Sequence, residues 1–134
     1  MKITHQGLKK KLWKVFSEYI RRRDADWKGY VKCCTCGKRM HWKEADAGHY
    51  KSKNQGLAVY FLEYNVHPQC TGCNRFRHGN LTSYAIYLQE RYGDDILKKI
   101  EWSAHQHIKI NSKEYENLIK LYKEKIRLLD NFKN

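Results

Sequence analysis

The 134-residue sequence has few acidic residues, a single proline and no long apolar run. None of its apolar stretches approaches the roughly 18 residues of a membrane-spanning helix, which argues against a membrane protein. The N-terminal stretch "MKITHQGLKKKLW" lacks the apolar core of a signal peptide. We therefore expect a cytoplasmic protein. In that compartment, the five cysteines are expected to bind metal rather than to form disulfides.

Internal repeats, low-complexity tracts and linkers are also missing, which favours a single domain over residues 1–134. Hydrophobic residues make up 41% of the chain, with ten tyrosines and four tryptophans, a composition typical of folded proteins. The mixture of helical and strand-like patterns described below indicates an α+β fold.

The shortage of acidic side chains leaves a large positive charge. Lys and Arg number 27 against 14 Asp and Glu, a net charge of +13. Residues 1–44 alone hold 13 basic and 4 acidic side chains, so most of the excess lies in the first third. Such an excess favours a polyanionic partner, most simply nucleic acid, over a merely solubilising surface. A membrane-surface role is disfavoured, because there is no lipidation motif or basic amphipathic tail.

Helical periodicity is clearest near the two ends of the chain. Residues 7–24 carry Leu8, Leu12 and Phe16 on one face and basic residues on the other, including the run "RRRD". That basic face can contact phosphates or simply be solvated. Ser112 is the predicted N-cap of a last helix over 112–133, with an apolar stripe that includes Tyr115, Ile119 and Tyr122.

The middle of the chain is less periodic. Residues 40–52 have the alternation and aromatic content of a strand or hairpin, and residues 51–59 resemble a loop. We expect a short helix from Asn74 to His78 closed by Gly79, and another over 81–92 that ends at Gly93.

Two cysteine pairs, Cys33-x-x-Cys36 and Cys70-x-x-Cys73, predict a structural zinc site with four thiolates. Cys34, beside a ligand, is expected to face away. A redox role is the alternative, but neither pair lies in a thioredoxin-like βαβ pattern. The 33 residues between the pairs exceed the spacing of a compact zinc ribbon, so the insert has room for a second site.

The segment "CTGCNRFRHGN" suggests where that second site lies. On a helix that starts near Cys73, Asn74 and His78 are spaced i and i+4, so both could reach one divalent cation, with Asp46 adding a carboxylate. The alternatives are a capping role for Asn74 and a helix-terminal role for His78.

The motifs "YIRRRD", "CCTCG", "ADAGHY" and "YNVHPQCTGCNRFRHGN", in that order, resemble the phage NinG, or Rap, recombination-endonuclease family over roughly residues 8–100. That family is similar to the HNH, or ββα-metal, nucleases. Its last zinc-binding cysteine is followed directly by an asparagine, which is similar to the arrangement in the junction resolvase endonuclease VII. The resemblance implies a zinc-stabilised HNH core over 33–79, flanked by an N-terminal helix and by a helical part over 81–133.

Position by position, the resemblance implies that His49 is the general base. It also implies that Asn65 braces the loop and orients the His49 ring. Asn74 becomes a ligand of the catalytic metal, with His78 as a second. Many HNH enzymes have an acid or a histidine just before the base, where this chain has Gly48. Asp46 could take that role if the strand bends or bulges near Ala47 and Gly48. His67 could instead be a ligand or support one.

The predicted function is metal-dependent endonucleolytic cleavage of DNA, with Mg²⁺ or Mn²⁺ at the catalytic site and, by the resemblance, branched recombination intermediates as substrate in the cytoplasm of an infected bacterium. The alternative is a zinc-stabilised nucleic-acid-binding module without catalysis. A homodimer through the 112–133 stripe would supply two active sites, unless that stripe packs on the first helix of its own chain. The side chains expected to contact DNA are Lys9, Lys10, Lys14, Arg21, Arg22, Arg23, Arg75 and Arg77.

Overall fold

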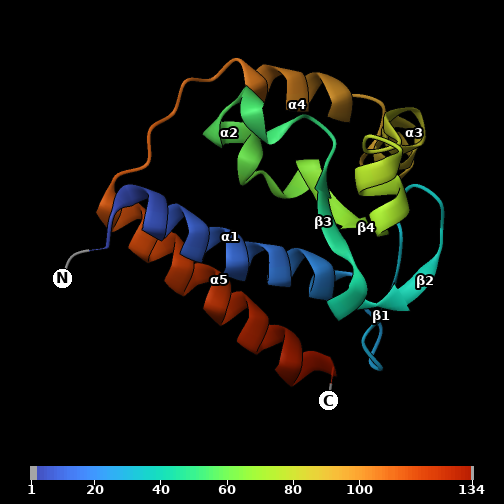
Figure 1. The fold of residues 1–134 in the computed structure, drawn as a ribbon, viewed down its shortest axis with the longest axis horizontal. Coiled ribbons are helices and arrows are strands. Elements are labelled where there is room, and N and C mark those ends of the chain that lie inside the picture. The colour runs from blue at the N-terminus through green and yellow to red at the C-terminus, as the bar shows by residue number, and fades with distance from the viewer. Residues whose placement is uncertain (1–2, 134) are drawn as a thin grey trace.

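The longest helices, α1 (His5–Arg23) and α5 (Ser112–Lys133), lie side by side and run in the same direction in the computed structural model, which describes residues 3–133 (Figure 1). Their contact is apolar and fully buried at its centre. It is formed by Leu8, Leu12, Phe16, Ile20, Tyr115, Ile119 and Tyr122. Burying each such side chain contributes roughly 1.5–3 kcal/mol. The apolar stripe of α5 therefore packs on α1 of the same chain and is not available as a dimer interface. The homodimer itself stays a prediction.

Local hydrogen bonds set where these two helices begin. The Thr4 hydroxyl accepts from the Gly7 backbone N–H at 3.0 Å, so α1 starts two residues earlier than predicted. At α5 the cap is Asn111 and not Ser112. The Asn111 side chain accepts from the Glu114 N–H at 2.8 Å, and the Glu114 carboxylate accepts from the Asn111 N–H at 3.3 Å, which is a reciprocal capping box.

The described strands form two small antiparallel sheets. One pairs β1 (Tyr30–Lys32) with β2 (Arg39–His41), and the other pairs β3 (Asp46–His49) with β4 (Val66–Gln69). Strands in residues 40–52 are thus confirmed. A hairpin within that stretch is not, because β2 and β3 take different partners, and a 3₁₀ turn over Trp42–Glu44 separates them.

Shorter helices cover the far side of β3 and β4. They are α2 (Leu57–Tyr60), α3 (Leu81–Tyr92) and α4 (Ile96–Ala104), which share a core that includes Val59, Tyr84 and Leu88 (Figure 1). The helix α3 ends at Gly93 as predicted, with a left-handed φ of 96°. Residues 51–59 are not simply a loop, since they hold a 3₁₀ turn and the start of α2.

The helix α4 was not singled out from the sequence. It is nine residues long, and Ile96 and Ile100 are its buried residues. Within residues 3–133, no helix combines the length and the apolar character that crossing a membrane requires.

Candidate functional site

The four cysteines of the two pairs meet at one point, as their spacing predicts. The sulfur atoms of Cys33, Cys36, Cys70 and Cys73 all lie within 4.8 Å of one another, and those of Cys36 and Cys70 are 3.7 Å apart. A tetrahedral zinc site with bonds of about 2.3 Å places its sulfurs about 3.8 Å apart. The four thiols are therefore close enough to hold one metal ion and suit structural zinc. We call this group the cysteine knuckle.

Neighbouring groups donate hydrogen bonds to the cysteine knuckle. The Cys73 sulfur accepts a hydrogen bond from the Asn80 side-chain amide at 3.6 Å and another from the Arg77 guanidinium at 3.8 Å. Such donors stabilise thiolate charge. Arg77, predicted to contact DNA, is thus engaged with a sulfur. Cys34 takes no part in the knuckle and packs against the α3–α4 core, where burial raises the pKa of its thiol.

The segment after Cys73 is not the α-helix that the sequence predicted. It forms one π-helical turn over Gly72–Phe76, in which the Arg77 N–H donates to the Gly72 carbonyl at 2.9 Å. His78 then has a left-handed backbone with φ of 49°. The expected i and i+4 pairing of Asn74 and His78 on one helical face is therefore wrong, although both residues line the same cleft.

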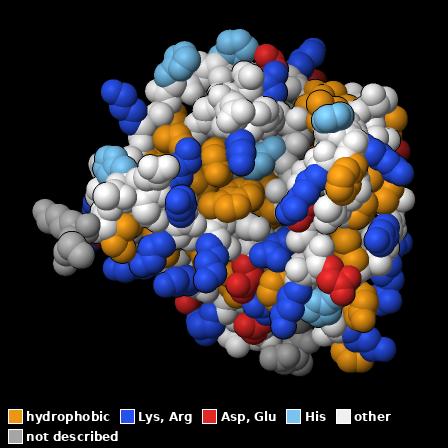
Figure 2. All heavy atoms as spheres, in the orientation of Figure 1, with side chains coloured by type: hydrophobic (Ala, Val, Ile, Leu, Met, Phe, Trp, Pro, Cys, Tyr) orange, Lys and Arg blue, Asp and Glu red, His pale blue; other side chains and the backbone are white. Residues whose placement is uncertain are grey.

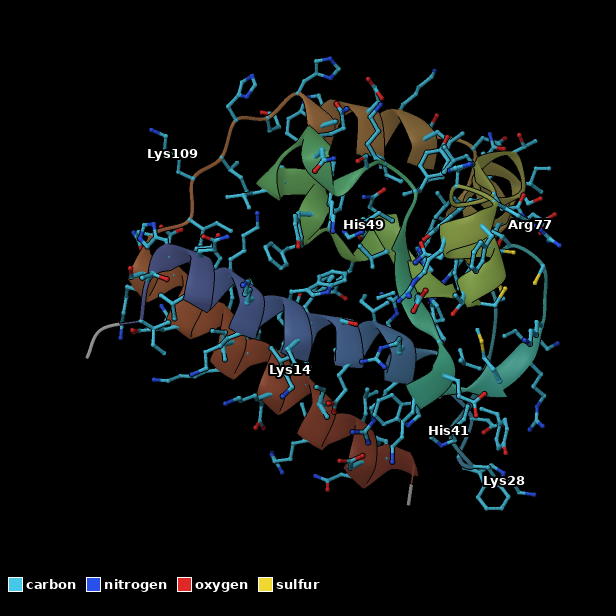
Figure 3. All side chains as sticks on the ribbon, in the orientation of Figure 1. Lys14, Lys28, His41, His49, Arg77 and Lys109 are labelled. Atoms are coloured by element: carbon cyan, nitrogen blue, oxygen red, sulfur yellow. The ribbon has the colours of Figure 1, made fainter. Side chains whose placement is uncertain are left out.

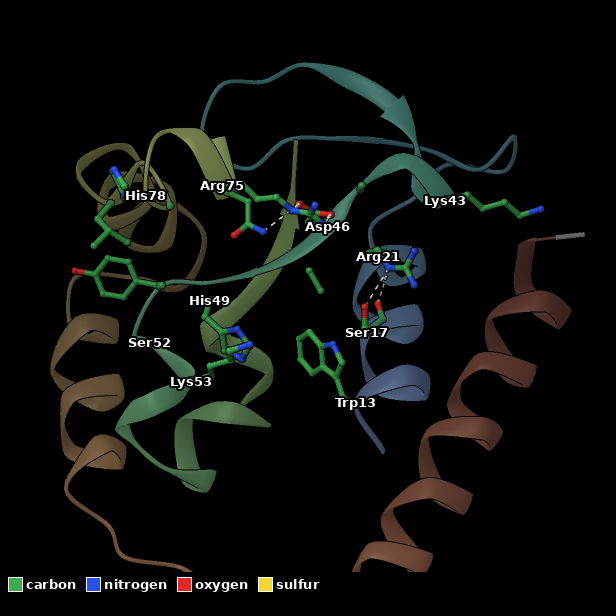
Figure 4. Close-up of a pocket in the computed structure, with 16 residues that line it drawn as sticks. Trp13, Ser17, Arg21, Lys43, Asp46, His49, Ser52, Lys53, Arg75 and His78 are labelled. Atoms are coloured by element: carbon green, nitrogen blue, oxygen red, sulfur yellow. Dashed lines mark hydrogen bonds and ion pairs between the residues drawn. The ribbon is translucent and has the colours of Figure 1, made fainter. Parts of the chain in front are cut away.

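That cleft has a volume of about 730 Å³ and lies between α1, β3 and the segment after the knuckle (Figure 4). It brings together Asp46, His49, Asn74 and His78, four of the residues singled out from the sequence. Basic side chains surround them, with Asp46 as the one acid among the lining residues. The lining Lys and Arg residues are Arg21, Lys43, Lys53 and Arg75.

The Asp46 carboxylate accepts three side-chain hydrogen bonds in the cleft. One comes from the Asn74 amide at 3.0 Å, and two come from nitrogens of Arg75 at 3.1 and 3.3 Å. The bulge expected near Ala47 and Gly48 is absent from the pairing, because β3 and β4 keep an unbroken register across all four residues. Asp46 and His49 nevertheless both line the cleft, so their meeting requires no bulge in this strand pair.

His49 is held on three sides. Its ring stacks on Trp13, with centroids 5.2 Å apart, and meets the edge of the Tyr60 ring at 5.4 Å. Its Nε2 lies 2.9 Å from the Tyr60 carbonyl oxygen. A carbonyl oxygen can only accept, so Nε2 carries the proton and the neutral ring keeps its lone pair on Nδ1. Burial, with a smaller contribution from Lys53, lowers the pKa of His49 below its usual value.

Asn65 lies outside the cleft and is completely buried. Its side chain accepts from the Lys51 N–H at 2.7 Å and donates to the Lys51 and Val59 carbonyls at 2.9 and 3.0 Å. These bonds tie the end of β3 to α2, the helix whose Tyr60 carbonyl binds His49. Asn65 therefore braces the two segments that follow His49 and precede Tyr60.

His67 occupies the opposite side of the β3–β4 pair from the cleft. The Tyr84 hydroxyl donates to the Gly48 carbonyl at 2.7 Å, so it accepts from His67 Nδ1 at 3.0 Å. His67 Nε2 then accepts from the Tyr92 hydroxyl at 2.7 Å. Burial lowers the pKa of His67 to about 3. His67 is thus a neutral core residue, and it does not reach the cleft as a ligand.

Gly48, the departure from the usual HNH pattern, has a steric cause. A β-carbon at this position would lie 1.9 Å from Gln69 Oε1 and 3.0 Å from Asn74 Oδ1. Gln69 is fixed there by donating to the Gly79 carbonyl at 2.8 Å. A side chain at position 48 would therefore displace the Gln69 side chain and crowd that of Asn74.

The arginine run at the end of α1 divides among three environments. Arg21 lines the cleft and donates to the Trp42 carbonyl at 3.3 Å. Arg22 pairs with Glu18 at 3.1 Å and with Asp130 of α5. Arg23 has only 14% of its side chain exposed and donates to backbone carbonyls of residues 63 and 66, so it serves the fold.

The lysines of α1 are also divided. Lys9 lies over the Tyr60 ring, 4.6 Å from its centroid, and lines a hollow with Lys10 beside Trp13. Lys14 instead lines a groove between α1 and α5, away from the cleft (Figure 3). Figure 2 shows basic side chains spread widely over this face of the molecule, around an apolar hollow near its centre.

Several lining residues were not predicted. Trp13 reads as one more apolar residue of α1, and Lys43 and Lys53 have no local pattern that separates them from other lysines. The signal that could have found these lysines is their position a few residues before and after "DAGH".

Comparison with known proteins gives the family. The model of the family described as "Bacteriophage Lambda NinG protein" matches residues 2–133. The chain belongs to the NinG family. The match includes α5, which the sequence motifs alone left open.

Curated relatives agree with this NinG assignment. The protein ninG of Escherichia phage lambda is 35% identical over 89 residues, 66% of this chain and 41% of that protein. The protein ninG of Salmonella phage P22 is 33% identical over 109 residues, 81% of this chain and 51% of that protein. The chain thus spans about half the length, or less, of these NinG relatives. No solved structure matches it.

Proposed function

We propose that this NinG-family chain is a metal-dependent DNA endonuclease of the HNH type. The observation that carries the proposal is His49: a neutral imidazole fixed through Nε2, in a cleft lined by basic side chains, beside an Asp46–Asn74 pair. Among residues 3–133, its Nδ1 has no hydrogen-bond partner. A base needs a lone pair that the fold does not already use, and Nδ1 provides one.

The donor types in the cleft are those that a hard divalent cation such as Mg²⁺ or Mn²⁺ takes, although within residues 3–133 Asp46, His49 and His78 do not converge on one point as the four cysteines do. Asp46 offers a carboxylate, Asn74 an amide oxygen when its side-chain amide is turned, and His78 an imidazole in the same cleft. When bound, such a cation supplies positive charge that stabilises the oxygen leaving phosphorus. The ion pair between Arg75 and Asp46 has to open for Asp46 to become a ligand.

The chain's own groups then divide the work. Arg21, Lys43 and Lys53 attract a phosphodiester into the cleft through charge. His49 Nδ1 takes a proton from the water that attacks phosphorus, while Trp13 and the Tyr60 carbonyl hold the ring in place. Because its pKa is lowered by burial, His49 is neutral and competent as a base at pH 7.

The substrate class rests on the resemblance to recombination endonucleases, which favours branched DNA such as D-loops and four-way junctions. The competing function is nucleic-acid binding without catalysis, in which the Asp46–Arg75 ion pair is permanent and His49 only packs on Trp13.

A nicking assay separates the two functions. Purified protein is incubated with duplex, single-stranded, forked, D-loop and four-way DNA, each with and without Mg²⁺ or Mn²⁺. We expect metal-dependent nicks, most rapid on a branched substrate. Binding to these DNAs without any metal-dependent cut would support the non-catalytic function and end the endonuclease proposal.

A further inference from the structure

The loop between α1 and β1 presents an exposed tryptophan. Trp27 has 75% of its surface open to solvent, more than any other tryptophan in the described chain. It lies in a loop that projects from the body of the molecule near the C-terminal end of α5, beside the labelled Lys28 (Figure 3). An exposed indole is a large flat apolar surface available for stacking.

This loop is held in one shape. The Asp26 carboxylate accepts from the Lys28 and Tyr30 N–H groups at 3.0 and 2.9 Å, and the Gly29 N–H donates to the Asp26 carbonyl at 2.9 Å. Gly29 has a φ of 88°, and a β-carbon there would lie 2.6 Å from the His41 ring. Trp27 is therefore displayed from a fixed turn, which reduces the entropy lost when it binds a ligand.

Cationic and aromatic side chains lie close to Trp27. The Lys28 ammonium lies 5.0 Å from the Trp27 ring centroid, and a hollow of about 200 Å³ beside it is also lined by Arg22, His41 and Trp42. The two acids of this hollow already have cationic partners. Asp26 pairs with Arg39 at 3.3 Å, and Asp130 pairs with Arg22. The surface thus combines aromatic and cationic groups and suits a ligand with both flat rings and negative charge.

This hollow and the cleft are separate cavities, and Trp42 lies between them. Trp42 lines the hollow, and the Arg21 guanidinium and Lys43 ammonium lie 5.3 and 5.8 Å from its ring centroid. Both of these cations line the cleft. A chain of cations and aromatic rings therefore runs from the cleft to Trp27.

We propose that Trp27 stacks on an unpaired base of the same DNA strand whose phosphodiester enters the cleft. This inference rests on the proposed function, which places the strand there. Bases inside a duplex already stack on their neighbours, so a projecting indole reaches a base face at least cost where the strand is unpaired. The Trp27 surface, defined by Trp27, Lys28, His41 and Trp42, thus selects DNA with a single-stranded portion beside the cleavage site.

The test measures binding, without added Mg²⁺ or Mn²⁺ so that no DNA is cut, and without chelator so that any zinc stays bound. Two probes are compared by fluorescence anisotropy: a blunt duplex and the same duplex with an unpaired tail that carries 2-aminopurine. The variants are Trp27→Ala, Trp27→Phe, which keeps a ring, and Trp102→Ala. Trp102 is a matched control, because it is 66% exposed on α4 and lines neither the cleft nor the hollow.

We expect Trp27→Ala to weaken binding of the tailed probe about tenfold and to leave the blunt duplex unchanged. Trp27→Phe should retain most of the affinity, Trp102→Ala should retain all of it, and quenching of 2-aminopurine should require an aromatic residue at position 27. An equal loss on both probes, or no loss on either, would overturn the stacking role. These outcomes are independent of nicking, so a wild-type protein that binds tails through Trp27 but never cuts would refute the proposed endonuclease alone.

Discussion

The cysteine knuckle and the cleft meet in one segment, residues 70–79, yet they are built in opposite ways. In the knuckle four identical side chains from two short motifs converge within 4.8 Å, and donors such as Asn80 complete their surroundings. In the cleft, different groups come from α1, β3 and the π-helical turn, and His49 keeps one ring nitrogen unbonded within the described chain.

The difference indicates a division of labour. A site whose ligands are all satisfied stabilises a fold, whereas a site with a free lone pair and an ion pair that can open is suited to chemistry. Gly72–Phe76 links the two, because Cys73 belongs to the knuckle and Asn74 to the cleft. Changes in the knuckle should therefore remove both structure and function, and changes in the cleft should remove function alone.

The largest effect is expected from Cys73→Ser. Loss of one thiolate should abolish tight zinc binding, and structural zinc contributes on the order of 10 kcal/mol to folding. We expect elemental analysis to show one zinc per wild-type chain and none in the variant, which should lose its cooperative thermal unfolding.

The matched control is Cys34→Ala, which removes the neighbouring thiol outside the knuckle. It should keep its zinc and lose only about 1 kcal/mol, because a partly buried sulfur is removed. A Cys73→Ser protein that retains zinc and unfolds like the wild type would refute the knuckle assignment.

The next largest effect is expected from His49→Gln. Glutamine can still donate to the Tyr60 carbonyl but offers no basic nitrogen, so the nicking rate should fall roughly 10²- to 10⁴-fold. Zinc content and unfolding temperature should stay close to those of the wild type. His105→Gln, which changes an exposed histidine at the end of α4, should cut normally. Wild-type cutting by His49→Gln would exclude this residue as the base.

The pH dependence of nicking sharpens the same assignment. His49 acts as a base only when neutral, and burial lowers its pKa below the ordinary value of about 6.5. The rate at saturating metal should therefore be level above pH 6.5 and fall about tenfold per unit only at pH values below the lowered pKa. A rate that still rises between pH 7 and 8 would point to a different titrating group.

The knuckle could be predicted from the sequence because Cys-x-x-Cys pairs fix both the ligand type and the local turn. The sequence also predicted one shared site for Asp46, His49, Asn74 and His78. It predicted an α-helix after Cys73, however, where the chain forms a π-helical turn. The π-helical turn and the left-handed His78 depend on the fixed position of Cys73 and on the Gly79 N–H donating to its carbonyl at 2.9 Å, which spacing does not reveal.

What sequence reasoning missed depends on tertiary contacts. The run "RRR" looks uniform, yet Arg23 donates to the backbone carbonyls of residues 63 and 66, which are far away in the chain. Lys43 and Lys53 belong to the cleft only because β3 lies between them. The N-cap of α5 is Asn111 and not the predicted Ser112, because an Asn-x-x-Glu capping box satisfies two backbone donors at once.

A smaller effect is expected on how steeply the affinity for DNA falls as the salt concentration rises. Arg21→Gln with Lys43→Gln removes two cations from the cleft, and each lost phosphate contact should flatten the slope of log K against log[salt] by about 0.9 on duplex DNA. The double variant Lys98→Gln with Lys99→Gln, on the exposed surface of α4, removes the same charge elsewhere. Equal slopes in the two double variants would mean that the cleft does not contact phosphates.

The smallest effect concerns Arg75→Ala and the metal. Arg75 is 67% exposed, so its pair with Asp46 is worth less than about 1 kcal/mol, but a divalent cation must displace it to reach the carboxylate. Removing Arg75 should tighten Mn²⁺ binding two- to threefold in calorimetry without DNA, and Arg75→Lys should lie in between because it keeps the charge. Arg127→Ala removes an arginine of similar exposure from its pair with Glu124 on α5 and should leave Mn²⁺ binding unchanged. If Arg75→Ala bound Mn²⁺ no better than the wild type, Asp46 would not be a ligand, and the cleft would be left with His49 but without its predicted metal.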